Sequence, residues 1–117
     1  MAHFPQMRTK VRAPRVRVPN DEPVSFTIQE KRVSATLQKL SLTGGLAQLN
    51  KDPGRITLAE IRLETLAGPV RGLVEFLPPL KQRNAYHVPF RFIALDEVDQ
   101  ARLKKTLHIM RQQGLGE

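Results

Sequence analysis

The residues best suited to hold a ligand fall into two short segments of this 117-residue chain. The first segment is basic and holds five cations within ten residues: Arg8, Lys10, Arg12, Arg15 and Arg17. No acidic residue precedes Asp21, so the cluster repels itself unless anions approach it. Guanidinium groups fork onto phosphate oxygens and stack on base faces. We therefore expect a phosphate-bearing partner. The charge alone is compatible with nucleic acid, anionic lipid or a phosphorylated small ligand. It is equally compatible with a merely solvated basic tail.

The second segment is residues 39–45, with the sequence Lys-Leu-Ser-Leu-Thr-Gly-Gly, at the end of a predicted strand. Ser41 can offer its hydroxyl to a base or a phosphate, and Lys39 can attract a phosphate. Gly44 has no side chain, so the backbone there can turn and approach a ligand closely. A simple hairpin turn capped by Ser41 is the alternative interpretation of the same residues.

Enzyme signatures are missing from the sequence. The three histidines, His3, His87 and His108, do not lie at metal-ligand spacing, and the chain contains no cysteine. Ser41 is not part of a G-x-S-x-G elbow, and neither a P-loop nor a dinucleotide-binding fingerprint occurs. We therefore expect a protein that is not an enzyme and that uses neither a metal nor a catalytic cofactor.

Apolar and polar residues alternate with a period of two through most of the chain, which predicts half-buried strands. Six strands are expected, at residues 24–29, 33–39, 46–49, 56–63, 70–76 and 86–92. Residues 20–23 form a turn signal, and a change of parity between Leu58 and Ile61 predicts a bulge. Pro89 lacks an amide donor, so its strand is expected at an edge.

The period changes at Asp96, which is a candidate N-cap for a helix of about residues 97–113. Ala101, Leu103, Leu107 and Met110 recur at helical spacing and predict the buried face. Short antiparallel strands leave open edges and an exposed apolar face unless they close into a barrel that the helix covers. We therefore predict a mainly β fold, a six-stranded antiparallel barrel with a C-terminal helix, spanning residues 11–117 after a flexible N-terminal arm of residues 1–10.

The two ligand-binding segments and this strand order together resemble the PilZ family. In that family an R-x-x-x-R motif precedes the barrel, and a (D/N)-x-S-x-x-G motif lies where an early strand meets the next turn. Ser41 and Gly44 match the second motif, and the resemblance extends from about Arg8 to Met110. It implies a six-stranded PilZ barrel whose ligand is cyclic di-GMP (c-di-GMP), a molecule with two phosphates and two guanines. The implied ligand-binding residues are Arg8, Arg12, Arg15, Lys39, Ser41 and Gly44.

Two departures from the family pattern affect this interpretation. Lys39 occupies the position of Asp or Asn, and lysine donates hydrogen bonds but cannot accept them from a guanine edge. Val11 lies four residues before Arg15, whereas Arg12 lies three before it, and Arg8 and Arg12 have the family spacing at an earlier position. Either Arg12 and Arg15 form a shifted pair or the motif is degenerate.

The resemblance implies a c-di-GMP receptor that changes its interaction with an unknown effector protein when the ligand binds. A degenerate PilZ module that binds a protein without nucleotide is the first alternative. A nucleic-acid-binding small barrel is the second, and it is disfavoured because aromatic residues make up only 5% of the chain. No apolar stretch approaches the roughly 20 residues of a membrane span, and the absence of cysteine fits a reducing compartment, so we expect a cytoplasmic protein.

Overall fold

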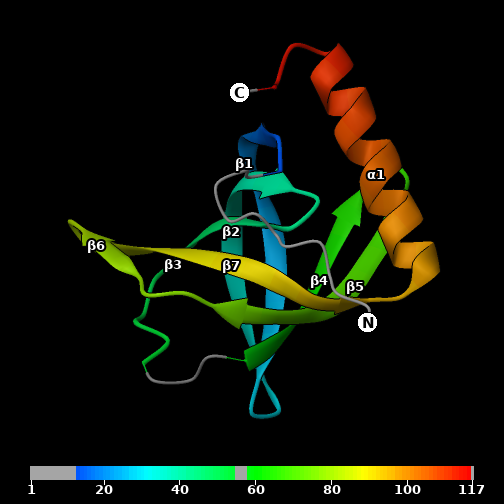
Figure 1. Ribbon diagram of the computed structural model, residues 1–117. Helices are drawn as coiled ribbons and strands as arrows, with labels where there is room; N and C mark the ends of the chain where they lie inside the picture. Colours follow the sequence, from blue (N-terminus) through cyan, green and yellow to red (C-terminus); the bar gives the residue numbers. More distant parts are fainter. Residues whose placement is uncertain (1–12, 55–57, 117) are drawn as a thin grey trace, which may run out of the picture.

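The computed structural model describes residues 13–54 and 58–116, and over these ranges strands precede a single α-helix (Figure 1). The elements are β1 (Arg15–Ile28), β2 (Lys31–Ser41), β3 (Gly44–Leu49), β4 (Leu58–Thr65), β5 (Gly68–Phe76), β6 (Leu80–Gln82), β7 (Ala85–Leu95) and α1 (Glu97–Gln112). The predicted flexible arm of residues 1–10, with Arg8, and the neighbouring Arg12 lie outside the described residues.

Six of the strands close into an antiparallel barrel. The sheet runs in the order β3-β2-β1-β4-β5-β7, and the additional pairing of β3 with β7 joins its two ends. The short β6 pairs with the start of β7 and lies outside this ring. The predicted mainly β fold, a six-stranded antiparallel barrel followed by a helix, is confirmed, and the closure leaves few unpaired strand edges.

The core fills the barrel interior with alternate residues of each strand. Phe26 is fully buried, and its ring makes edge-to-face contacts with Phe76 and Phe90 at centroid distances of 5.0 and 5.8 Å. These rings join β1 to the neighbouring strands β5 and β7, in which Phe76 and Phe90 are register partners. Because each ring removes a large apolar area from water, this cluster is a principal source of the barrel's stability.

The predicted bulge in β4 is wrong. β4 alternates regularly, with Ala59, Ile61 and Leu63 buried, while Leu58 is 52% exposed. The parity change in the sequence therefore arises because Leu58 faces outward. Apolar side chains on a barrel's outer surface are ordinary, and the alternation alone could not identify this one as exposed.

The predicted turn at residues 20–23 is instead an irregular part of β1. Pairing passes from Arg17 opposite Lys39 directly to Glu22 opposite Leu37, so β1 has extra residues that β2 does not match. Such a bulge bends the strand without ending it. Pro19 lies among the unmatched residues, where a missing amide donor interrupts no regular ladder, and Pro23 lies opposite Thr36 just after the pairing resumes.

Pro89 was expected at a sheet edge, and this expectation is also wrong. β7 pairs with β3 on one side and with β5 and β6 on the other, and Pro89 lies opposite Leu46. The Pro89 carbonyl accepts from Leu77 N at 2.8 Å, in the gap between the β5 and β6 pairings. Since the nitrogen and carbonyl of a strand residue point to the same side, the missing donor faces this gap rather than a regular ladder.

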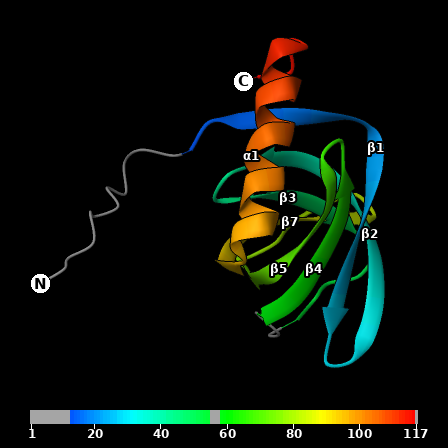
Figure 2. The ribbon, with the colours of Figure 1, turned by 90° about the vertical axis from the view of Figure 1, so that its right-hand side faces the viewer.

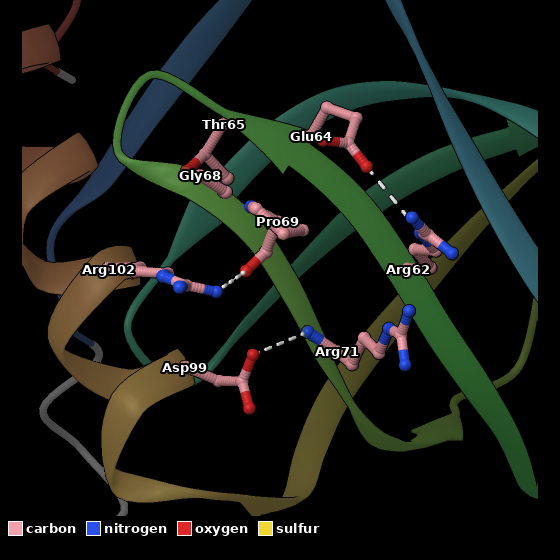
Figure 3. Close-up of polar contacts among 8 residues, drawn as sticks. All are labelled: Arg62, Glu64, Thr65, Gly68, Pro69, Arg71, Asp99 and Arg102. Atoms are coloured by element: carbon pink, nitrogen blue, oxygen red, sulfur yellow. Dashed lines mark hydrogen bonds and ion pairs between the residues drawn. The ribbon is translucent and has the colours of Figure 1, made fainter.

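The helix α1 packs across the barrel and is fastened to the β4–β5 hairpin (Figures 2 and 3). The Asp99 carboxylate accepts from Arg71 N at 3.0 Å, and the Arg102 guanidinium donates to the Pro69 carbonyl at 2.9 Å. Asp96 occupies the N-cap position, but its side chain makes no capping hydrogen bond. Asp99, in the first turn, thus connects the helix to the barrel and also complements the helix dipole.

The buried face of α1 differs from the prediction at one position. Leu103, Leu107 and Met110 are buried as expected, whereas Ala101 is exposed and Thr106 takes the remaining buried position. Among the described residues, α1 is too short and too polar to cross a membrane. Its three buried apolar side chains pack the helix against the barrel.

Candidate functional site

The start of β1 lies beside the end of β2, which brings the two predicted ligand-binding segments together. Arg15 is directly opposite Ser41, and Arg17 is directly opposite Lys39. Val16 lies between the two arginines and is fully buried, so Arg15 and Arg17 project from the other side of the strand, on the barrel's outer surface. We call Arg15, Arg17 and Lys39 the cationic face.

The C-terminal tail holds the other edge of β1 beside this face (Figure 2). Arg17 N donates to the Leu115 carbonyl at 2.9 Å, and Gly116 forms a bridge with Val16. The Arg111 guanidinium donates to the Pro14 carbonyl at 3.4 Å. A fourth cation, from the end of α1, is thereby brought next to Arg15.

Arg111 was not among the predicted site residues. The sequence associates it only with the negative end of the helix dipole, and nothing local indicates a partner 97 residues earlier in the chain. Arg17 was also left out of the predicted ligand set, although its spacing of two from Arg15 in an extended segment places both on one face. This spacing could therefore have identified Arg17 as a site residue from the sequence.

Ser41 builds the turn that follows β2. Its Oγ accepts from Thr43 N and from Gly44 N, each at 3.2 Å, and lies 3.2 Å from the Gly44 carbonyl, to which it can donate. Ser41 is 3% exposed. The hydroxyl is therefore engaged within the protein, and its visible role is to fix the path of the chain next to Arg15.

Replacing Ser41 by alanine is expected to lower the free energy of unfolding by about 1–2 kcal/mol, because the buried amide of Gly44 and the part-buried amide of Thr43 lose their acceptor. Urea denaturation followed by circular dichroism would measure this change. Ser34→Ala is the matched control, since Ser34 is an exposed residue of the same strand and its replacement should change stability by no more than about 0.5 kcal/mol. Equal effects of the two substitutions would contradict the assigned role of Ser41.

Gly44 lies where β3 meets β7. It is buried opposite Arg91, and a Cβ atom there would lie 2.0 Å from the Phe90 carbonyl oxygen. The missing side chain therefore permits the close approach of two strands. The sequence analysis interpreted the missing side chain of Gly44 as space for a ligand. In the structure, the backbone of β7 occupies that space.

A polar cluster that the sequence analysis did not identify lies on the same outer surface. The Gln38 side-chain amide donates to Gln48 Oε1 at 3.1 Å, and His87 Nδ1 lies 2.9 Å from Gln38 Oε1. Because a carbonyl oxygen only accepts, His87 Nδ1 is the donor in this contact. Gln38 sits at the irregularity in the β2–β3 pairing, next to Lys39.

The neighbours of Gln48 and His87 show why the cluster faces outward. Ala47 and Leu49 on β3 and Val88 on β7 are buried, so Gln48 and His87, which are register partners, point away from the core. Period-two alternation could have placed both residues on the surface. Their contact with Gln38 depends on the strand order and was not predictable from local sequence.

Comparison with solved structures identifies the fold. The chain superposes on the PilZ domain with c-di-GMP of YcgR from Escherichia coli with a TM-score of 0.71 and 15% identity, covering 91% of this chain and 95% of that one. It also matches the Borreliella burgdorferi PlzA protein in complex with c-di-GMP, with a TM-score of 0.58 and 13% identity over 85% of this chain and 52% of that one. No protein-family profile and no curated protein sequence matches the chain.

The fold is that of a PilZ domain, as the sequence resemblance implied. Both neighbours are described with c-di-GMP, and this protein shares their architecture at a low level of sequence identity.

Proposed function

We propose that this protein is a c-di-GMP receptor domain that binds the nucleotide on the cationic face and is not an enzyme. The observation that carries the proposal is the strand register, which pairs Arg15 with Ser41 and Arg17 with Lys39 on the outside of a PilZ barrel. Cations gathered on one surface favour a ligand that carries negative charge. A dinucleotide with two phosphates meets that requirement.

The chemistry of the ligand matches the residues on this surface. Arg15 and Arg17 can fork onto phosphate oxygens or onto guanine O6 and N7, and Lys39 adds a point charge for a phosphate. Ser41 and Gly44 support the site indirectly, through the turn and the strand contact described above. We expect Arg8 and Arg12, which lie outside the described residues, to add further cations to this site.

Ligand binding would affect the interaction with a partner protein through a change at the start of β1. This segment is held on one edge by β2 and on the other by the tail at Leu115 and Gly116, next to α1. Tightening β1 around an anion would therefore change the surface that α1 and the tail present. We propose that an effector protein in the cytoplasm binds this surface differently once the ligand is bound.

Isothermal titration calorimetry tests the proposal. The full chain should bind c-di-GMP with a saturable, exothermic isotherm in the micromolar range or tighter, and its affinity should fall as salt increases because the contacts are charge-assisted. Linear pGpG is the control ligand, since it has the same bases and lacks the cyclic backbone. Absence of heat at high micromolar c-di-GMP would refute the proposal.

A protein-interaction module without nucleotide is the second candidate function. It is favoured by Lys39 in place of Asp or Asn and by the engagement of the Ser41 hydroxyl within its own turn. A null titration, together with capture of an effector protein in the absence of nucleotide, would favour this function over the first.

A further inference from the structure

The start of β2 has a free edge beside the β1–β2 hairpin, which projects below the barrel in Figure 2. The pairing of β2 with β3 ends at Thr36 opposite Gln48. Residues 31–35 therefore pair with β1 on one side and with no described strand on the other. A free strand edge presents backbone donors and acceptors that a further strand can pair with. This edge lies at the opposite end of β2 from Ser41 and the cationic face.

The geometry of the hairpin identifies the backbone groups that face the free edge. Both residues of the Gln29–Glu30 turn have positive φ, 51° and 69°, as the central residues of a type I′ turn do. Such a turn closes on a hydrogen-bonded pair, here Ile28 and Lys31, and hydrogen-bonded pairs then alternate along the two strands. The N–H and C=O groups of Arg32 and Ser34 therefore point away from β1. Within the described residues no loop or turn supplies them with a backbone partner.

A pocket of about 440 Å³ borders this edge. Side chains from the start of β2 and from the loop after β3 line it, among them Lys31, Val33, Ser34, Lys51 and Pro53. Both lysines are exposed, and Val33 and Pro53 are partly exposed, so a ligand in the pocket can reach all four. Free backbone groups, apolar side chains and ammonium groups are therefore accessible at one place.

The charges at this pocket indicate the kind of strand that fits the edge. The described lining holds three cations, Lys31, Arg32 and Lys51. Its acidic residue, Asp52, already accepts from Gly54 N at 2.8 Å, and neither lysine forms an ion pair within the described residues. Cations on a strand edge repel a second copy of this protein, whose net charge is +8, and attract an acidic chain. The edge thus selects a partner of opposite charge.

We propose that an extended acidic segment of a partner protein adds to the sheet along this edge of β2. The backbone of the segment pairs with the free groups of Arg32 and Ser34, and an apolar side chain between its acids packs on Val33. Its carboxylates contact Lys31 and Lys51. Main-chain hydrogen bonds supply the affinity, and the lysines supply the selection for acidic residues. This site is separate from the cationic face and does not depend on nucleotide binding.

NMR titration of the full chain with the acetylated and amidated peptide Glu-Glu-Val-Glu-Glu tests the proposal. Saturable shifts are expected at the amides of Arg32, Ser34 and Lys51, and saturating c-di-GMP should leave them unchanged. The same peptide with lysine in place of glutamate, or with methylated backbone nitrogens, should bind about tenfold more weakly or worse. Equal binding of either control peptide, or no shifts at millimolar peptide, would overturn the proposal. Equal shifts over the cationic face would also overturn it, because they would show a general attraction of acids to a basic protein.

Ser34→Pro removes the amide donor at the free edge. This amide points away from β1, so the β1–β2 ladder keeps its hydrogen bonds, and proline is tolerated on an edge strand. The variant should retain its circular dichroism spectrum and bind the acidic peptide about tenfold more weakly. Ser34→Ala keeps the amide and should bind it within about twofold of the original affinity. An unchanged affinity of Ser34→Pro would overturn the backbone pairing.

Charge reversal tests the same site with the backbone intact. The double variant with Lys31→Glu and Lys51→Glu should lose binding of the acidic peptide and gain binding of the lysine peptide. Its affinity for c-di-GMP should stay within about twofold at physiological salt, because charges beyond about 8 Å are screened. Undiminished binding of the acidic peptide by this variant would overturn the assignment of the two lysines.

Discussion

Replacing Arg15 by alanine is expected to weaken c-di-GMP binding roughly ten- to a hundredfold. A hydrogen bond to a charged group contributes about 1.5–3 kcal/mol, and each 1.4 kcal/mol corresponds to about a tenfold change in the dissociation constant. Arg15 is half-buried next to the turn at Ser41, so its side chain is less free than that of a tail residue. Calorimetric titration of the variant against the original chain measures the loss.

Arg32→Ala is the matched control for this experiment. Arg32 is an exposed arginine near the start of β2, whereas Ser41 lies at the end of the same strand, so the substitution removes the same charge at a distance from the cationic face. Its effect on affinity should stay within about twofold at physiological salt, because charges beyond about 8 Å are screened. If both variants lose affinity equally, the attraction is a general effect of net charge and the proposed site is wrong.

The second large effect is expected for Gly44→Ala, which should lower the free energy of unfolding by about 3 kcal/mol. A Cβ at this position would meet the Phe90 carbonyl oxygen at 2.0 Å and the Arg91 Cα at 2.8 Å. Both are backbone atoms of β7, so the overlap can be relieved only by moving β3 and β7 apart. That movement opens the pairing that closes the barrel.

Thermal unfolding would show this effect as a fall in melting temperature of roughly 12–24 °C, given roughly 4–8 °C for each kcal/mol in a small domain. Gly116→Ala is the control, because a Cβ there meets only the Arg111 Cγ, at an ordinary 3.6 Å. Similar stability of the Gly44→Ala variant and the original chain would contradict the assigned role of Gly44.

The strand and helix pattern was predictable because it depends on local periodicity. Val24, Phe26 and Ile28, at alternate positions of β1, are all buried. The helix begins at Glu97, as predicted, and ends at Gln112. The first predicted strand starts at residue 24, so the beginning of β1 was not among the six predicted strands. Its pairing with β2 and with Gly116 depends on distant residues.

The candidate site was predictable only in part. The juxtaposition of Arg15 with the turn after β2 follows from the family resemblance, and the register agrees with it. The proximity of Arg111 and the contact between Gln38 and His87 arise from barrel closure and helix docking, which no local pattern specifies. The roles of Ser41 and Gly44 could be assigned only from the structure, because a glycine or serine in a turn is compatible with several roles.

Chemical-shift mapping with c-di-GMP tests the central claim most directly. A titration of isotopically labelled protein should shift the backbone amides of Arg15, Arg17 and Lys39 together, with smaller changes at Leu115 and Gly116 in the adjoining tail. The amides of β4 and of the Gln29–Glu30 turn, at a distance from the cationic face, should stay unchanged. Shifts that leave Arg15, Arg17 and Lys39 unaffected, or that appear elsewhere on the barrel, would contradict the proposed receptor site.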